Sequence, residues 1–287
     1  MTPAWRTIKD AYLDACRGEV EALKPGNVHR FADGHRMTAD QFVLSAEVSA
    51  PAISEPNAPV GRRVFDAVAA TREKVGTNTN LGIVLLAAPL AKAAEDDRAH
   101  LRDALQRTLD SMDGQDASDV FSAIRLANPG GLGSAEAGDV RQAPIISLID
   151  AMAMAADRDM IARQYVTCFA DIFGSGLTAL KDAAERGETG MWPTVFTYLH
   201  FLSHFPDSHV GRKYGSGISE KIRQEAQTIE REVRHEASLS RRQDMLLDFD
   251  SRLKAQNINP GTSADLTVAT LFISNMNFSL HKRYAGG

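Results

Sequence analysis

The longest apolar block of the chain, residues 83–94, has no charged side chain except Lys92 and predicts a buried helix. Small and polar residues, apart from Leu81, fill positions 76–82 directly before it and predict a turn that presents the helix N-terminus. Free backbone N–H groups and the helix dipole make such an end suited to an anion. Asn78 and Asn80 are also good N-capping residues, so a purely structural role is the alternative.

Apolar positions recur with the period of an α-helix in most of the remaining chain. Residues 218–235 give the clearest case, because Ile218, Ile222 and Val233 fall on one stripe. No segment alternates apolar and polar residues for long enough to indicate a strand. The pattern predicts helices over residues 4–23, 37–50, 62–74, 83–94, 101–109, 117–126, 145–156, 160–180, 192–205, 218–235, 246–253 and 266–276.

We therefore predict an all-α fold, a bundle of about nine or more helices. The core helices are scattered along the sequence and no linker separates them, which predicts a single domain over residues 1–287.

The same pattern predicts where the helices are interrupted. A proline-rich stretch that begins at Pro51 should end one helix, because proline opposes helix continuation. Residues 113–118 should form a turn, and residues 207–215 a polar loop. Gly174 and Gly176 lie inside an apolar run, which indicates close helix packing or a kink.

Composition narrows the function classes. The chain has 287 residues, of which 44% are hydrophobic and 24% charged, enough to bury a sizeable core. The net charge of −5 argues against a nucleic-acid-binding or anionic-membrane surface, although a local basic pocket is compatible with it. Cys16 and Cys168 form neither a disulfide framework nor a cysteine zinc motif.

Targeting signals give a second constraint. No apolar run approaches the roughly 20 residues that a transmembrane helix needs, and the first residues lack the apolar core of a signal peptide. We expect a cytoplasmic protein with no membrane or nucleic-acid partner.

Five polar, glycine-containing loops each precede a hydrophobic helix, and in a helical bundle we expect them to gather at one end and form a pocket. They cover residues 24–28, 76–82, 128–141, 207–215 and 259–265. Their lysine and arginine side chains suit phosphate, and their carboxylates suit a hydrated Mg²⁺ ion. The candidate metal ligands are Asp139, Asp207 and Asp265.

Structural interpretations of the same side chains remain open. Thr262 with Asp265 resembles a capping box, and Asp207 is itself a good cap. Lys24 could complement the C-terminus of the first helix, and Arg212 with its neighbour could be a solvated pair.

Other catalytic motifs are absent or incomplete. The sequence has no phosphate-binding P-loop, and the glycine-rich residues 130–133 follow no predicted strand. His200 and His204 are four residues apart but lack the glutamate of a zinc protease. Residues 174–176 lack the spacing of a nucleophile elbow, so we reject a serine hydrolase.

Four of the loops carry motifs that resemble those of the triphosphoribosyl-dephospho-CoA synthase family. They are Lys-Pro-Gly-Asn-Val at 24–28, Asn-Thr-Asn-Leu-Gly at 78–82, Pro-Gly-Gly-Leu-Gly at 129–133 with Asp-Val-Arg at 139–141, and Pro-Gly-Thr-Ser-Ala-Asp at 260–265. The resemblance covers nearly the whole chain. It implies an all-α transferase that moves the 5-triphosphoribosyl group of ATP to the 2′-hydroxyl of dephospho-CoA and releases adenine, in the biosynthesis of a prosthetic group.

The chain departs from the better-known family members at several positions. His29 stands where they carry aspartate, Arg36 falls where they carry a second aspartate, and Asn80-Leu81 replaces His-Lys. The version here is similar to an archaeal-type branch, for which the acceptor does not follow from the family. A second hypothesis is therefore the same donor chemistry on another acceptor, such as a methanopterin-type one-carbon carrier. A third is a nucleotide-binding protein that has lost catalysis.

The resemblance and the chemistry of N-glycosidic bond cleavage together suggest roles for the loop residues. Carboxylates stabilise the oxocarbenium character that develops, and Asp139 and Asp207 are the candidates, with Mg²⁺ binding as their other role. His35 or His209 would take the proton of the acceptor hydroxyl. ATP contacts are expected from Lys24, Asn78, Thr79, Asn80, Arg141, Arg212 and Lys213. A homodimer is compatible with the sequence.

Overall fold

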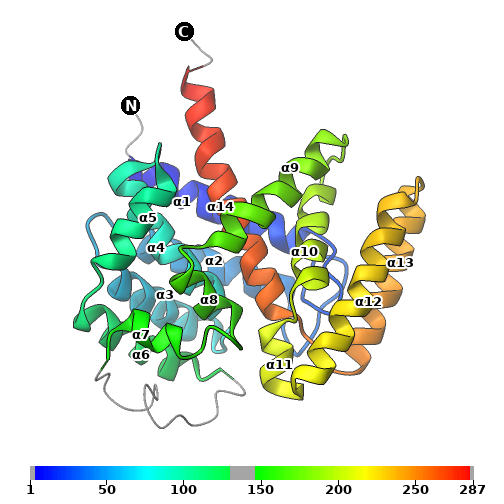
Figure 1. The fold of residues 1–287 in the computed structure, drawn as a ribbon, viewed down its shortest axis with the longest axis horizontal. Helices are drawn as coiled ribbons and strands as arrows, with labels where there is room; N and C mark the ends of the chain where they lie inside the picture. Colours follow the sequence, from blue (N-terminus) through cyan, green and yellow to red (C-terminus); the bar gives the residue numbers. More distant parts are fainter. Residues whose placement is uncertain (1–3, 130–145, 285–287) are drawn as a thin grey trace.

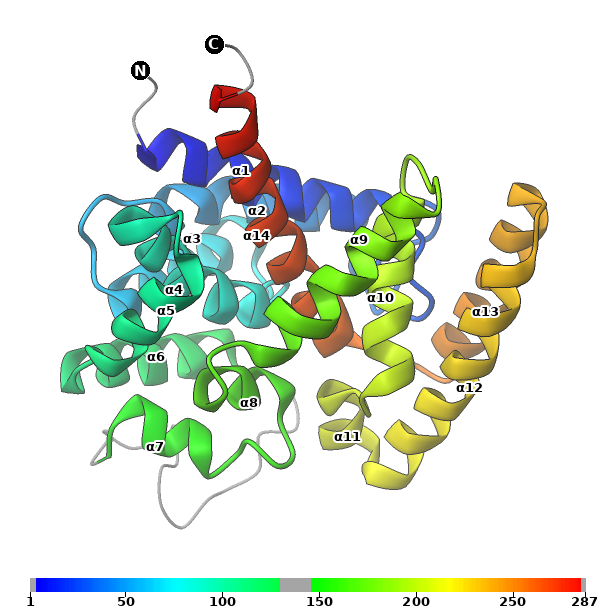
Figure 2. The ribbon, with the colours of Figure 1, turned by 45° about the horizontal axis from the view of Figure 1, so that its top comes forward.

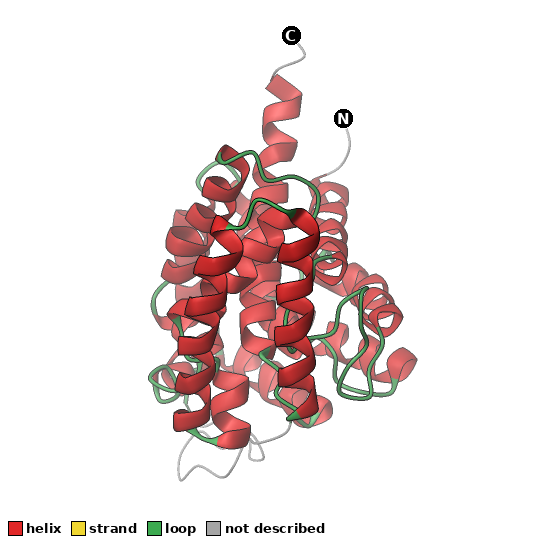
Figure 3. Ribbon diagram, turned by 90° about the vertical axis from the view of Figure 1, so that its right-hand side faces the viewer, coloured by secondary structure: helices red, strands yellow, loops and turns green. Residues whose placement is uncertain are grey.

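The computed structural model describes residues 4–129 and 146–284, and the described chain is all-α, as predicted. Figure 3 shows helices joined by loops throughout, without a strand in the described part. The elements are α1 (Ala4–Glu21), α2 (Ala39–Ile53), α3 (Val60–Val75), α4 (Leu81–Asp97), α5 (Leu101–Asp110), α6 (Gly114–Ala127), α7 (Leu148–Ala153), α8 (Met160–Val166), the π-helix η1 (Ile172–Gly176), α9 (Leu177–Glu185), α10 (Trp192–His204), α11 (Ser208–Tyr214), α12 (Ser216–His235), α13 (Leu239–Ala255) and α14 (Gly261–Tyr284).

The helices form two groups with α14 running between them (Figures 1 and 2). α2 to α6 lie on one side and α9 to α13 on the other, while α1 runs from the first side past α14 toward α10. α14 packs against α1, against α4 of the first group and against α10 and α11 of the second. It supplies Ala264 to one apolar cluster and Leu266 to the other, and the single domain over residues 1–287 stays a prediction.

The structure differs from the predicted breaks in three places. Pro51 lies inside α2 instead of ending it. The Asp113 side chain caps α6 by accepting from the backbone N of Asp116, and the backbone N of Asp113 donates to the Asp116 carboxylate in return, so the predicted turn over 113–118 is largely helix. The predicted loop over 207–215 contains the short helix α11, which Asp207 caps.

The predicted helix over 160–180 is interrupted, and one of its glycines lies in a close helix contact. The chain passes from α8 through η1 into α9. A Cβ atom at Gly176 would lie 2.6 Å from Oγ1 of Thr270 and 2.7 Å from Cζ of Phe201, so only glycine allows this contact with α10 and α14. Close helix packing at Gly176 is therefore confirmed.

α4 is the buried helix that the apolar block predicted, and a proline within it creates a tertiary bond. Pro89 has no N–H group, so the carbonyl of Leu85 has no partner four residues along the helix. The hydroxyl of Tyr165 donates to that carbonyl at 2.6 Å in the buried interior. This bond attaches α8 to α4. In the described part of the chain, no helix combines the length and apolarity needed to cross a membrane.

Substitution of Tyr165 by phenylalanine tests this attachment. The change leaves the buried Leu85 carbonyl without a donor, and we expect a loss of about 1–3 kcal/mol in the free energy of unfolding. Tyr214→Phe is the matched control, because its hydroxyl makes an exposed bond to the Asn257 carbonyl at 2.8 Å. Urea unfolding of both variants measures the difference, and equal stabilities would contradict the assigned role.

Candidate active site

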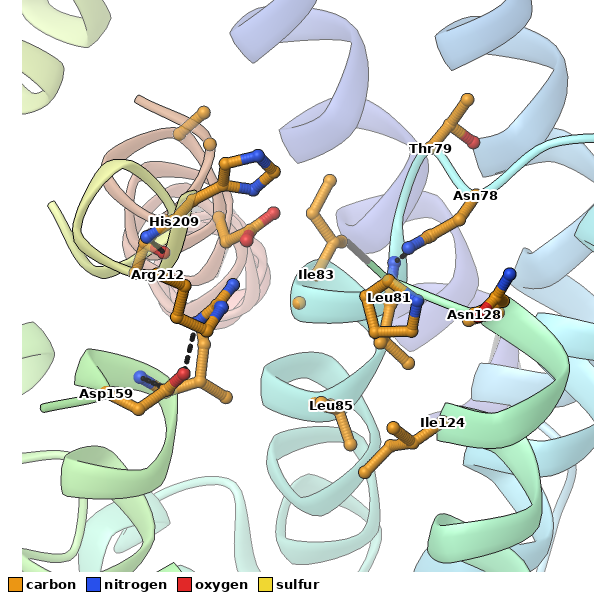
Figure 4. Close-up of a pocket in the computed structure, with 18 of the residues that line it drawn as sticks. Asn78, Thr79, Leu81, Ile83, Leu85, Ile124, Asn128, Asp159, His209 and Arg212 are labelled. Carbon is orange, nitrogen blue, oxygen red and sulfur yellow. Dashed lines mark hydrogen bonds and ion pairs between the residues drawn. The ribbon is translucent and has the colours of Figure 1, made fainter. Parts of the chain in front are cut away.

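A cavity of about 1180 Å³ lies where the predicted polar loops meet. Each of the five loops contributes a described lining residue, namely Asn27, Asn78, Asn128, His209 and Asn259. The predicted gathering of loops at one end of a bundle is therefore confirmed. Figure 4 shows side chains of α8 and α11 on one wall and those of α4, α6 and the turn before α4 on the other.

The turn before α4 presents part of its polar surface to the cavity. Oδ1 of Asn78 accepts from the backbone N of Leu81 at 3.2 Å, so Asn78 caps the helix while it lines the cavity (Figure 4). Gly82 and Ile83, in the first turn of α4, also line the cavity. N–H groups in a first turn have no acceptor within the helix, which suits this end to an anion.

Asn80 points away from the cavity into the core. Its side-chain nitrogen donates to Oγ of Ser49 at 3.3 Å and to the Ser45 carbonyl at 3.5 Å, and the residue is 4% exposed. Thr79 lines the cavity, and its hydroxyl bonds that of Ser45. Asn78 and Thr79 can therefore reach a ligand directly, whereas Asn80 connects the turn to α2.

The opposite wall is built on α11. His209 and Arg212 both line the cavity, and Arg212 forms an ion pair with Asp159, the N-cap of α8 (Figure 4). Lys213 is exposed and lies 5.2 Å from the centre of the Tyr214 ring, outside the described cavity lining. Of the two predicted neighbouring cations, Arg212 is thus the one that faces the cavity.

The carboxyl group of Asp265 faces the cavity beside the N-terminus of α4. A Cβ atom at Gly82 would lie 2.0 Å from Oδ2 of Asp265, so a glycine is required there. Burial raises the pKa of Asp265 well above its usual range, and the negative charges of Asp207 and Glu19 raise it further. The positive charge of Arg212 acts in the opposite direction, but the net effect leaves the pKa of this cavity carboxyl group raised.

Asp207 lies behind this wall, where it connects two helices. Its Oδ1 accepts from the backbone N of Val210 at 3.0 Å. Its Oδ2 accepts from both N and Oγ of Ser263 at 2.8 Å. The capping alternative is thus what the structure shows for Asp207, and its carboxylate is fully used within the protein.

His35 lines the cavity on a tight turn. His35 and Arg36 have φ angles of 55° and 63°, and the flanking residues Gly34 and Met37 pair as an antiparallel bridge. Left-handed conformations cost side-chain-bearing residues about 1–3 kcal/mol each and often mark functional sites. Nε2 of His35 lies 2.7 Å from the Gly26 carbonyl, which can only accept, so this nitrogen carries a proton and Nδ1 is left as the acceptor.

Lys24 does not face the cavity in this structure. Its ammonium group is fully buried and lies 2.8 Å from Oε1 of Glu19. It also donates to Oδ1 of Asn27 at 3.4 Å. The ammonium thereby neutralises Glu19, which does line the cavity. Asp139 and Arg141 lie outside the described residues.

No cluster of three or more potential metal-ligating side chains occurs within the described parts of the chain. Asp265 is the predicted metal ligand whose carboxyl group faces the cavity, since Asp207 is engaged by backbone and hydroxyl donors. Mg²⁺ is commonly held by one or two carboxylates together with substrate phosphates, so Asp265 fits a partial protein site that a polyphosphate completes.

Sequence reasoning missed several charged residues of the cavity. Arg72 and Arg125 lie on amphipathic helices, where the apolar period assigns charged residues to the solvated face. Arg158 follows α7. Asp159 was not predicted because its sequence position does not distinguish it from the many acidic residues expected at the surface. The full set of missed charged lining residues is Glu19, Arg36, Arg72, Arg125, Arg158 and Asp159.

Comparison with known proteins identifies the family of the chain. The CitG family model, ATP:dephospho-CoA triphosphoribosyl transferase, matches residues 5–283. A crystal structure from Archaeoglobus fulgidus, provisionally described as a triphosphoribosyl-dephospho-CoA synthase, is 27% identical in sequence with a TM-score of 0.64. The match covers 80% of this chain and 96% of that one. No curated protein matches the chain. The resemblance of the loop motifs is thereby confirmed, and the chain belongs to the CitG family of ATP:dephospho-CoA triphosphoribosyl transferases.

Proposed function

We propose that this chain transfers the 5-triphosphoribosyl group of ATP to a hydroxyl group of dephospho-CoA and releases adenine. The observation that carries the proposal is the meeting of five polar loops around one cavity, four of which carry motifs that resemble those of the family, in a chain that the family model matches almost from end to end. In this reaction the bond from ribose C1′ to the adenine nitrogen breaks and a bond from C1′ to the acceptor oxygen forms. The acceptor proton leaves to a base and adenine takes up a proton.

The cavity walls offer groups for the triphosphate. Asn78 and the first turn of α4 supply an amide and backbone N–H groups, and Arg212 supplies a guanidinium group. Asp265 would hold Mg²⁺ together with phosphate oxygens, and the ion would neutralise part of the phosphate charge. The predicted roles of Lys24, Asn80 and Asp207 become indirect under this proposal, because these side chains hold the loops in place.

A neutral histidine is suited to take the acceptor proton. Burial lowers the pKa of His35 below 6.5, and the positive charges of Lys213 and Lys254 lower it further. The hydrogen bond to the Gly26 carbonyl raises the pKa, but the net shift is downward. Burial also lowers the pKa of His209. Both imidazoles are therefore mostly neutral at pH 7.

A different hydroxyl acceptor is the second candidate function. Leu81 lines the cavity, at the position where the resemblance places a lysine in the better-known members. The charge of this wall therefore differs from theirs, and an acceptor with fewer phosphates would suit it.

We place the enzyme in the cytoplasm, where ATP is available, and retain the homodimer as a prediction.

The proposal is tested by incubating the purified protein with ATP, Mg²⁺ and dephospho-CoA. We expect adenine in equal amount to the modified acceptor, measured by chromatography and mass spectrometry. Adenine only with other hydroxyl acceptors would support the second candidate. Stabilisation by ATP with no adenine under any condition would leave a catalytically inactive nucleotide-binding protein.

Arg212 and Lys213 form a matched pair for testing the triphosphate site. Arg212→Gln should lower kcat/KM for ATP by about tenfold to a hundredfold, because hydrogen bonds to charged groups contribute about 1.5–3 kcal/mol. Lys213→Gln should leave kcat/KM unchanged when both variants are measured well above pH 6.5, where His35 and His209 are neutral with or without the charge of Lys213, since this side chain is exposed beside Tyr214. Equal effects of the two substitutions would remove Arg212 from the site. Thermal unfolding of Arg212→Gln controls for loss of the ion pair with Asp159.

The pH dependence tests the proton acceptor. Because the pKa of His35 is lowered, its neutral form persists as the pH falls below 6.5, and kcat/KM should decline only on the acidic side of that value. His35→Gln should remove this decline and reduce kcat by about 10²–10⁴. The exposed His235 gives the control substitution. A decline that persists in His35→Gln and disappears in His209→Gln would transfer the role to His209.

A further inference from the structure

The cavity has two chemically different ends. The polar end carries Asn78, His209, Arg212 and Asp265. The other end, which we call the apolar lobe, is formed by α4, α6, α7 and α8. Figure 4 shows Leu85 and Ile124 together at the end remote from His209. The residues of the apolar lobe are Leu85, Ile124, Leu148, Ala151, Met152 and Ala162.

The walls of the apolar lobe are fixed by the protein core. Leu85, Leu148 and Ala162 belong to the buried residues of the structure, so their backbone positions are set by packing on several sides. The bond from Tyr165 to the Leu85 carbonyl holds α8 against α4, and thus fixes two of the four sides. A preformed apolar wall favours a ligand segment that carries no charge.

The size of the cavity is compatible with the binding of more than one substrate. Pockets for a single drug-sized ligand are roughly 300–1,000 Å³, whereas this cavity measures about 1180 Å³. The cations are also distributed along it. Arg212 lies at the polar end, Arg125 directly follows Ile124 of the apolar lobe, and Arg158 lies between α7 and α8; all three line the same cavity. Two anionic ligands bound in this cavity can therefore each contact a guanidinium group.

We propose that the apolar lobe binds the pantetheine arm of dephospho-CoA while the triphosphate of ATP occupies the polar end. This inference rests on the proposed function. Of the two substrates, dephospho-CoA is the one with a long uncharged segment, and its pyrophosphate would lie near Arg125 and Arg158. ATP carries its charge close to the ribose that reacts, which matches the polar end. Both substrates are then bound together, and the pentosyl group passes directly from one to the other.

α7 offers a matched pair of substitutions for the test. Ala151 is half-buried and lines the cavity, whereas Ala153 is exposed and lies outside the described lining. Ala151→Leu should fill the lobe and weaken the binding of 4′-phosphopantetheine and of dephospho-CoA by about tenfold or more. Ala153→Leu should leave both affinities unchanged. Affinity for ATP should be unchanged in both variants, and all affinities are measured by isothermal titration calorimetry.

The outcomes separate this inference from the proposed function. Loss of ATP affinity in Ala151→Leu, with unchanged phosphopantetheine affinity, would place the nucleotide in the lobe and overturn the inference. Wild-type protein that forms adenine with dephospho-CoA but shows no effect of Ala151→Leu would also overturn it and leave the proposed function intact. Absence of dephospho-CoA binding in the wild type would overturn both. Ala155→Leu, at another half-buried lining position, replaces Ala151→Leu if that variant fails to fold.

Discussion

One buried carboxylate, that of Asp207, holds the polar end of the cavity together. It accepts hydrogen bonds from a backbone N–H of α11 and from both N and Oγ of Ser263 in α14. A buried charge is stable only when it is fully hydrogen-bonded, and each bond to a charged group contributes about 1.5–3 kcal/mol. The first turns of α11 and α14 are therefore joined firmly. This joint sets His209 and Arg212 on one side of the cavity with Asp265 beside them.

A second buried carboxylate, that of Asp250, holds the loop after α1 in place. Asp250 of α13 accepts from the backbone N of Gly26 at 2.8 Å and pairs with Lys254 at 3.0 Å. Gly26 has φ of 82°, and a Cβ atom there would lie 2.7 Å from Cδ of Pro260, so the left-handed turn and the close approach both require glycine. The Gly26 carbonyl lies 2.7 Å from Nε2 of His35. The α12–α13 pair thus positions a cavity histidine without lining the cavity itself.

The sequence predicted most of the fold because apolar periodicity records which helix faces are buried. The prediction was wrong where tertiary contacts outweigh the local sequence pattern. The segment over 207–215 has loop composition, yet Asp207 caps a short helix there, and no periodicity could reveal a helix of this length. The sequence predicted which loops form the site, but it did not predict which of their side chains face the cavity. Lys24 carries the positive charge that binds phosphate, but its ammonium group pairs with Glu19 instead. The sequence signal for this pair was the position of Glu19, an acid on the apolar stripe of α1.

The departures from the better-known family members have different structural meanings. Asn80 replaces a histidine, yet its side chain bonds Ser49 in the core, so this change alters the support of the turn. Leu81 replaces a lysine and lines the cavity, so this change removes a positive charge from the wall itself. Guanidinium groups elsewhere line the same cavity, among them Arg72 of α3 and Arg158 in the turn before α8. Because guanidinium groups bind phosphate in a defined planar geometry whereas an ammonium acts as a point charge, the two branches should differ more in the position of the bound phosphates than in the chemistry at ribose C1′.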